Sequence, residues 1–289
     1  MKPPEDSFFR TCFFEKDFIM LITTDTSITQ RLAAFEALAL PDYAETGIGT
    51  RAILEDEDDY APEESERRGV VAGNAINTFE GELSLPNERD LNNMGRYAEA
   101  VANRQVDKEK DIRQWYRKYT EVMGVLGLGL QSFGFEERGT TDASVKVDAV
   151  ALKLLGGAAM GAGKAGQILV ASIKDALSAI KDDQKALGLF EKQSSNTKGA
   201  NFQMMPAGQK ANGSCVVLLA CSYFHSSINK GKVLFVSWNK SKINIYGSAQ
   251  RTMFIRDDYD DEMRTEVARW LKKNAKYQFA SFKLPDDEK

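Results

Sequence analysis

The spacing of apolar residues changes along the chain and divides it into a helical part and a later β part. In residues 112–133 the apolar positions repeat every three or four residues, which places them on one face of a helix that weakens at its last glycines. The same period returns in residues 145–185 as two stripes, joined by a glycine-rich stretch at 156–166. Beyond about residue 196 the period shortens to two, as in β-strands. This order predicts an α+β fold, with a central helical block and a mainly antiparallel late sheet.

Within the late part, residues 214–224 (SCVVLLACSYF) are mostly apolar, so a strand formed by them would have two apolar faces. That pattern is typical of a strand buried on each side. The runs KVLFVSWN, KINIY and RTMFI follow, with a hairpin turn predicted at 239–242. A helix is expected after the acids at 257–261, ending at two lysines that suit its dipole, and one more strand closes the chain.

The first third of the chain is less regular. Residues 13–22 (FFEKDFIMLI) predict a strand that could return to the late sheet, and Ser27 and Gln30 have the spacing of a capping box before a helix. Residues 42–86 form an acidic, loop-rich segment. We expect a single compact domain over 1–289. A subdivision into a mainly helical part, 1–195, and a mainly β part with one helix, 196–289, stays open.

Composition limits the function classes. The chain has 289 residues, 43% hydrophobic and 28% charged, and a net charge of -4, which argues against nucleic acid as a partner. Three cysteines do not make a disulfide framework. The N-terminal MKPPEDS breaks any signal-peptide pattern, so the cytoplasm is the default location, with export without a cleaved leader left open. Lysines interrupt the most apolar region, so no obligate transmembrane helix is expected.

The glycine-rich join contains GAGKAG, residues 161–166, which fits a nucleotide-binding fingerprint. The residues around GAGKAG do not fit this fingerprint, because a helical pattern rather than a strand precedes it. Ala165 also stands where a phosphate-binding loop has Ser or Thr. A join between two packed helices is the simpler interpretation. Gly157 and Gly161 have the spacing that lets helices approach closely, and with Lys164 they are our candidates for membrane or partner contact.

Catalytic and metal-binding chemistry finds little support. His225 is the only histidine, at the end of a predicted strand, and the adjacent Ser226 would point away from it. The acidic residues lack the spacing of a calcium loop or of an acid–base pair. We assign no catalytic residue and no metal ligand. An enzyme is the third hypothesis, and it would depend on isolated groups such as Cys12, Cys221 or His225.

Two cysteines are the more specific candidates. Cys215 and Cys221 lie six positions apart on the predicted buried strand, hence on one face and about 20 Å from each other, too far for a disulfide or a shared metal. Each could be an inert small hydrophobe with a raised pKa. Alternatively, either could lie at the floor of an apolar cavity and carry or contact an acyl chain.

Three stretches, residues 112–135 (IRQWYRKYTEVMGVLGLGLQSFGF), 233–238 (VLFVSW) and 274–284 (NAKYQFASFKL), together with the order of the elements, resemble bacterial virulence-associated proteins of the Erwinia virulence factor type. This resemblance implies a small α/β protein that promotes persistence in an insect gut. It also implies a fatty acid linked as a thioester to a buried cysteine, with Cys221 and Cys215 both eligible here.

Taken together, these features predict a non-catalytic, virulence or toxin-associated binding protein that engages lipid or a membrane surface. No cofactor is expected, a fatty acid being the one exception. The alternative is a structural or interaction protein that self-assembles through sheet edges and helix faces, so that the partner would be another protein. Oligomeric state stays open.

Overall fold

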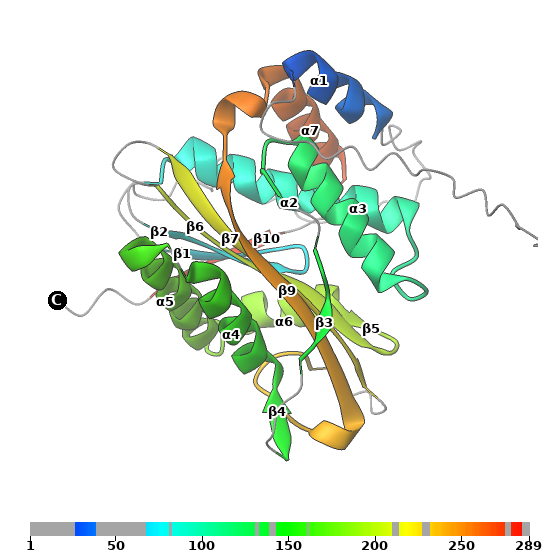
Figure 1. Cartoon of the computed structure of the whole chain (residues 1–289), viewed down its shortest axis with the longest axis vertical. Coiled ribbons are helices and arrows are strands. Elements are labelled where there is room, and N and C mark those ends of the chain that lie inside the picture. Colours follow the sequence, from blue (N-terminus) through cyan, green and yellow to red (C-terminus); the bar gives the residue numbers. More distant parts are fainter. Residues whose placement is uncertain are drawn as a thin grey trace, which may run out of the picture.

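A mixed, mostly antiparallel β-sheet runs through the centre of the molecule, and helices pack against both of its faces (Figure 1). The structure is a computed structural model that describes residues 27–38, 68–80, 83–130, 133–138, 143–160, 162–209, 214–226, 232–274 and 279–284. The strand order is β10-β1-β2-β6-β7-β9-β3, with β5 paired to β6. This architecture confirms the predicted α+β class.

The strands and helices have the following bounds. The strands of the central sheet are β1 (Arg68–Ala72), β2 (Ala75–Glu80), β3 (Glu136–Glu137), β5 (Ser195–Asn196), β6 (Gly199–Gln209), β7 (Cys215–Ser226), β9 (Ile243–Phe254) and β10 (Phe279–Lys283). Two short strands pair with each other outside it, β4 (Ser144–Lys146) and β8 (Ser237–Asn239). The helices are α1 (Ile28–Ala37), α2 (Leu85–Gln105), α3 (Ile112–Val125), α4 (Val147–Ala159), α5 (Gly163–Ala179), α6 (Gln184–Ser194) and α7 (Asp261–Lys273).

Strands β6, β7 and β9 form the long antiparallel centre of the sheet. The hairpin β1–β2 joins this centre through β2, which runs parallel to β6. Strand β10 then pairs with β1 at the edge. The sheet therefore takes strands from both sides of residue 196, and β1, β2 and β3 pair with strands that are distant in sequence.

Two hydrophobic cores lie on opposite faces of the sheet. The first packs α1, α2, α3 and α7 against one face, around side chains such as Trp115 and Trp270. The second packs α4, α5 and α6 against the other face, around Trp238 and Phe190. Because successive residues of a strand point to opposite faces, a buried strand such as β7 supplies apolar side chains to both cores. The three tryptophans are all buried.

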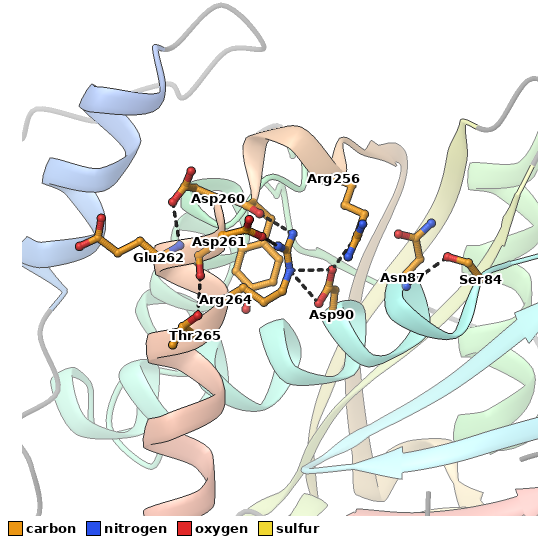
Figure 2. Close-up of polar contacts among 10 residues, drawn as sticks. Ser84, Asn87, Asp90, Arg256, Asp260, Asp261, Glu262, Arg264 and Thr265 are labelled. Carbon is orange, nitrogen blue, oxygen red and sulfur yellow. Dashed lines mark hydrogen bonds and ion pairs between the residues drawn. The ribbon is translucent and has the colours of Figure 1, made fainter. Parts of the chain in front are cut away.

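Ion pairs fix α7 and α1 to the first core, and Figure 2 shows those that Asp90 makes with Arg256 and Arg264. The Asp90 carboxylate on α2 has a side-chain exposure of only 4% and lies 3.1 Å from Arg264 Nε and 3.3 Å from Arg256 Nε. A second link joins the buried Arg31 of α1 to Asp258 at 3.1 Å, and Arg31 also donates to the Gly124 carbonyl. These contacts attach α7 and residues 256–258 to α2, and they attach α1 to Asp258 and to α3.

Helix ends follow the sequence closely. Ser27 and Gln30 form the expected capping box, since the Gln30 backbone N–H donates to Ser27 Oγ at 3.3 Å and the Ser27 N–H donates to Gln30 Oε1 at 3.2 Å. Helix α3 ends at Val125, just before Gly127, whose φ of +99° suits glycine. Helix α7 has acids in its first turn and lysines in its last, as predicted.

The structure corrects three local expectations. Residues 68–80, within the segment expected to be loop-rich, form the β1–β2 hairpin. The turn predicted at 239–242 is a short 3₁₀ helix that does not close a hairpin, because β8 pairs with β4 and β9 pairs with β7. KINIY and RTMFI belong to one strand, β9. The strand predicted at 13–22 and the acidic residues 55–66 lie outside the described residues.

Candidate functional site

Strand β7 carries both candidate cysteines on the face that lies under α2 and α3. Cys221 is completely buried and Cys215 is 3% exposed, and both are free thiols. Burial raises the pKa of the Cys215 thiol to about 12 and that of Cys221 well above its ordinary value. Both thiols are therefore protonated in the folded protein at neutral pH, and neither is an activated nucleophile.

The two cysteines differ in what surrounds them. Cys221 is directly opposite Gln203 on β6, so the two side chains are neighbours on the same face of the sheet. Gln203 is completely buried, and neither its amide nitrogen nor its amide oxygen has a hydrogen-bond partner among the described residues. Leaving a buried polar group unpaired costs about 1–3 kcal/mol. Gln203 therefore marks a place in the core that is suited to a further polar group.

Helix α3 covers this place with two tyrosines. The Tyr116 hydroxyl lies 3.0 Å from the Phe202 carbonyl oxygen and 2.6 Å from the Ser222 carbonyl oxygen, so it bridges β6 and β7. Burial raises the pKa of both Tyr116 and Tyr119 well above the ordinary value, and the nearby Cys221 contributes in the same direction. We call the group formed by Cys221, Gln203, Tyr116 and Tyr119 the Cys221 cluster.

The first core, to which the Cys221 cluster belongs, contains several methionines. Four buried methionines belong to the same core, contributed by α2, α3, β6 and α7: Met94, Met123, Met205 and Met263. Methionine side chains are flexible and fill irregular spaces, so a core built from them accommodates changes in content better than one built from branched side chains.

Cys215 lies at the other end of the buried strand. It pairs with Gln209, which is half-buried, and with Phe254 on β9. Burial alone accounts for its raised pKa, and no unpaired buried amide faces it in the register. The two cysteines are therefore a natural test and control pair on one strand.

The candidates on the glycine-rich join lie far from this core, on the helices of the opposite face of the sheet. Gly157 and Lys164 are exposed, and Gly161 lies outside the described residues. The close approach between α4 and α5 is made at Gly166, where an added Cβ would be 2.8 Å from the Ala159 carbonyl oxygen. An added Cβ at Gly157 would meet nothing within 4 Å. The helix preceding GAGKAG is α4, as the sequence indicated.

Other reactive groups stay apart. His225 is exposed at the end of β7, where its ring lies 5.6 Å from the ring of Tyr223. Within the described ranges no group of three or more His, Cys, Asp or Glu side chains could hold a metal ion. None of the described helices combines the length and apolar character needed to cross a bilayer. Cys12 lies outside these ranges.

Sequence reasoning missed Gln203. Strand β6 has polar residues at alternate positions, Asn201 and Gln203, between the apolar Phe202 and Met204. That alternation is typical of a strand with one face in water, but here α2 and α3 cover the polar face. Pro206 is also unusual in an interior strand, and it interrupts the ladder with β7.

Comparison with solved structures gives a likeness of fold at low sequence identity. No family model matches the chain, and no curated protein matches it. The solved structure described as "Structure of the Evf virulence factor" is similar over 70% of this chain and 82% of that chain, at 13% sequence identity and a TM-score of 0.31. A likeness of that size carries no argument about function.

Proposed function

We propose that the chain is a non-catalytic lipid-binding protein in which Cys221 carries an acyl chain as a thioester. The observation that supports this proposal best is Gln203, a completely buried amide without a partner directly opposite the thiol. The carbonyl oxygen of a thioester at Cys221 would accept a hydrogen bond from the Gln203 amide. That contact would remove one of the two unpaired groups, and its expected contribution is about 1 kcal/mol.

The rest of the acyl chain would lie among apolar side chains of the protein. Its methylene groups would pack beside the methionine-rich core under α2 and α3, where burial of each CH₂ is worth about 0.8 kcal/mol. Because protein interiors are close-packed, accommodating the acyl chain would require α2 and α3 to move away from the sheet as well as the methionines to change rotamers.

Acylation exchanges the thiol proton of Cys221 for the acyl group of an activated thioester donor, and the donor thiol leaves with that proton. Because the folded thiol is buried and its pKa is raised, it reacts poorly once the protein has folded. The proposal therefore places acylation before α3 closes over β7. Folded, unmodified protein mixed with an acyl donor should stay unmodified.

We extend this proposal to the biological setting that the sequence resemblance implies, a virulence or toxin-associated role in a bacterium. Its lipid part can be tested without that setting. If the lipid lies in the core under α3, α3 must move before the lipid can reach another molecule. The expected activity is binding of the lipid rather than catalysis.

Intact-mass spectrometry under denaturing conditions, before and after hydroxylamine, tests the proposal directly. We expect a mass excess equal to a fatty acyl group that hydroxylamine removes. Cys221→Ser should abolish the excess, whereas Cys215→Ser should keep it. Gln203→Leu should still be acylated but should bind the chain less firmly, giving faster hydroxylamine release from the folded protein.

An unmodified mass from cells able to supply activated fatty acids would overturn the covalent proposal. Native mass spectrometry of the same sample would then detect or exclude a non-covalently bound fatty acid. Retention of the acyl group in Cys221→Ser with its loss in Cys215→Ser would move the site to the other cysteine and remove the role of Gln203.

A further inference from the structure

The middle part of α4 and α5 differs in charge from the rest of the chain, between Asp148 in the first turn of α4 and Asp175 in α5. Residues 149–174 contain no aspartate or glutamate, although the chain has 42 such residues among 289. The same stretch contains three lysines, Lys153, Lys164 and Lys174. A locally basic surface on a protein of net charge -4 is a local feature that the overall composition conceals.

These three lysines are exposed, and within the described residues none of them forms an ion pair or a hydrogen bond. Some other lysines do form ion pairs, as Lys118 does with Glu121 at 2.8 Å and Lys110 with Asp107 at 3.2 Å. The three lysines are therefore unpaired in the described part of the chain, although Asp148 and Asp175 on the same helices leave a net charge of only +1, three lysines against two aspartates.

Apolar side chains project from the same surface. Met160, at the end of α4, is 79% exposed and Ile168 on α5 is 43% exposed, two of the five large apolar residues that are exposed in the described part. Exposed apolar groups beside unpaired lysines are typical of surfaces that lie in the head-group region of a membrane.

The helices that carry this surface are firmly attached behind it. Leu155 of α4 and Leu169 of α5 are buried in the second core, and Gly166 brings the two helices into backbone contact. Figure 1 shows α4 and α5 side by side on the face of the sheet opposite α2, α3 and α7. The surface is therefore preformed, and binding needs no rearrangement of the core.

The first turn of α5 adds donors for an anion. Its N-cap position is Ala162, which has no side-chain hydrogen bond to the helix, so the first backbone N–H groups lie beside Lys164 without a side-chain cap. Phosphate is the group that such N–H donors and lysines bind together.

From these features we propose that the α4–α5 surface, defined by Lys153, Met160, Lys164, Ile168 and Lys174, docks on an anionic phospholipid surface. The lysines would pair with lipid phosphates, and Met160 and Ile168 would enter the head-group layer. This inference stands apart from the acyl site, which lies in the other core. It gives the face through which the protein would approach a membrane.

Co-sedimentation of the full chain with vesicles tests this inference. We expect binding to phosphatidylglycerol–phosphatidylcholine vesicles that weakens as salt rises, and little binding to phosphatidylcholine alone. Each lysine near an anionic surface contributes about fivefold in affinity, so Lys153→Gln with Lys164→Gln should weaken binding about 25-fold. Met160→Ser should weaken binding to the anionic vesicles without changing its salt dependence.

A matched control comes from the opposite face. Lys272, exposed on α7, allows Lys272→Gln to be compared with Lys164→Gln at equal net charge. The control should keep wild-type binding, and circular dichroism should show that all variants are folded. Absence of wild-type binding, or equal losses in the two single variants, would overturn the proposal. So would a stable dimer that Met160→Ser dissociates, because the surface would then bind a second copy.

The acyl site and this surface can fail independently. If Cys221→Ser removes the acyl group but still binds anionic vesicles, the surface acts without the lipid. If the lysine variants lose binding but keep the acyl mass, the core site is intact. Binding that disappears only with the acyl group would overturn the role of the α4–α5 surface.

Discussion

Glu99 of α2 is a buried carboxyl group at the turn of the β1–β2 hairpin. Its Oε2 accepts a hydrogen bond from the Asn74 backbone N–H at 3.3 Å and packs against Gly73, whose φ of +64° suits the turn. Burial raises the pKa of Glu99 to about 7, against partial compensation by Lys108, the Asn74 and Asn103 hydrogen bonds and Arg96.

This raised pKa makes stability depend on pH in a defined direction. Because the folded protein holds the Glu99 proton more tightly than the unfolded chain, the stabilisation is fully present below about pH 4.5 and is lost as pH rises through about 7. The difference between the ordinary value of 4.5 and about 7 corresponds to roughly 3 kcal/mol. We therefore expect urea unfolding to give a higher free energy at pH 5 than at pH 8.

Glu99→Gln identifies the group responsible. The amide keeps the shape and carries no charge, so the pH dependence between 5 and 8 should shrink by most of that 3 kcal/mol. Glu36→Gln, on the exposed side of α1, serves as the control and should leave the dependence unchanged. An unaltered pH profile in Glu99→Gln would show that another group is responsible.

At the scale of elements, two glycines of the helix join are expected to respond in opposite directions to alanine. At Gly157 an added Cβ meets nothing, so Gly157→Ala should stabilise α4 by about 0.5–1 kcal/mol. At Gly166 it would lie 2.7 Å from Ala162 Cβ and 2.8 Å from a backbone oxygen. Gly166→Ala should therefore separate α4 from α5 and cost about 1–3 kcal/mol. Thermal unfolding of the two variants measures both signs, and destabilisation by Gly157→Ala would contradict the packing described here.

The contact between α2 and α7 depends on Asp90. Breaking a fully buried ion pair costs about 3–5 kcal/mol, but Arg256 and Arg264 have side-chain exposures of 49% and 23%, which lowers the expected cost of Asp90→Ala to about 2 kcal/mol. Asp261 also pairs with Arg264, yet it is 96% exposed, so Asp261→Ala should cost less than 1 kcal/mol. Chemical denaturation of both variants tests this ranking, and equal losses would show that Asp90 has no special role.

The elements that sequence could predict are those with a strong local signal. Helices α3, α5 and α7 and strand β7 have regular periodicity, and capping residues set the starts of α1 and α7. The hairpin β1–β2 has short strands that contain buried polar residues, Asn77 and Thr78, whose partners Asn92 and Ser172 are distant in sequence. Such partners have no local signature, so the strands could not be distinguished from the acidic loop.

The candidate site was predictable only in part, for the same reason. Burial of Cys221 follows from the apolar run around it, and that expectation is confirmed. The amide opposite it depends on the pairing of β6 with β7 and on coverage by α3, which are properties of the whole fold. Similarly, the opposite roles of Gly157 and Gly166 depend on how two helices cross, which spacing along one chain does not determine.

At the scale of the whole molecule, the two cores share every strand at the centre of the sheet. Strand β7 supplies Val217 and Cys221 to the first core and Leu218 and Ala220 to the second. Unfolding one core therefore exposes the other face of the same strands. We expect residues 68–284 to unfold as one cooperative unit rather than as parts divided near residue 196.

Tryptophan fluorescence can measure this cooperativity, because the three tryptophans report on different cores. Trp115 and Trp270 lie in the first core and Trp238 in the second. In Trp238→Phe the fluorescence reports only the first core, and in Trp115→Phe with Trp270→Phe it reports only the second. Within each variant, the urea midpoints from fluorescence and from far-ultraviolet circular dichroism should coincide. Separate midpoints would mean that the helices of one face can detach while the sheet and the other core persist.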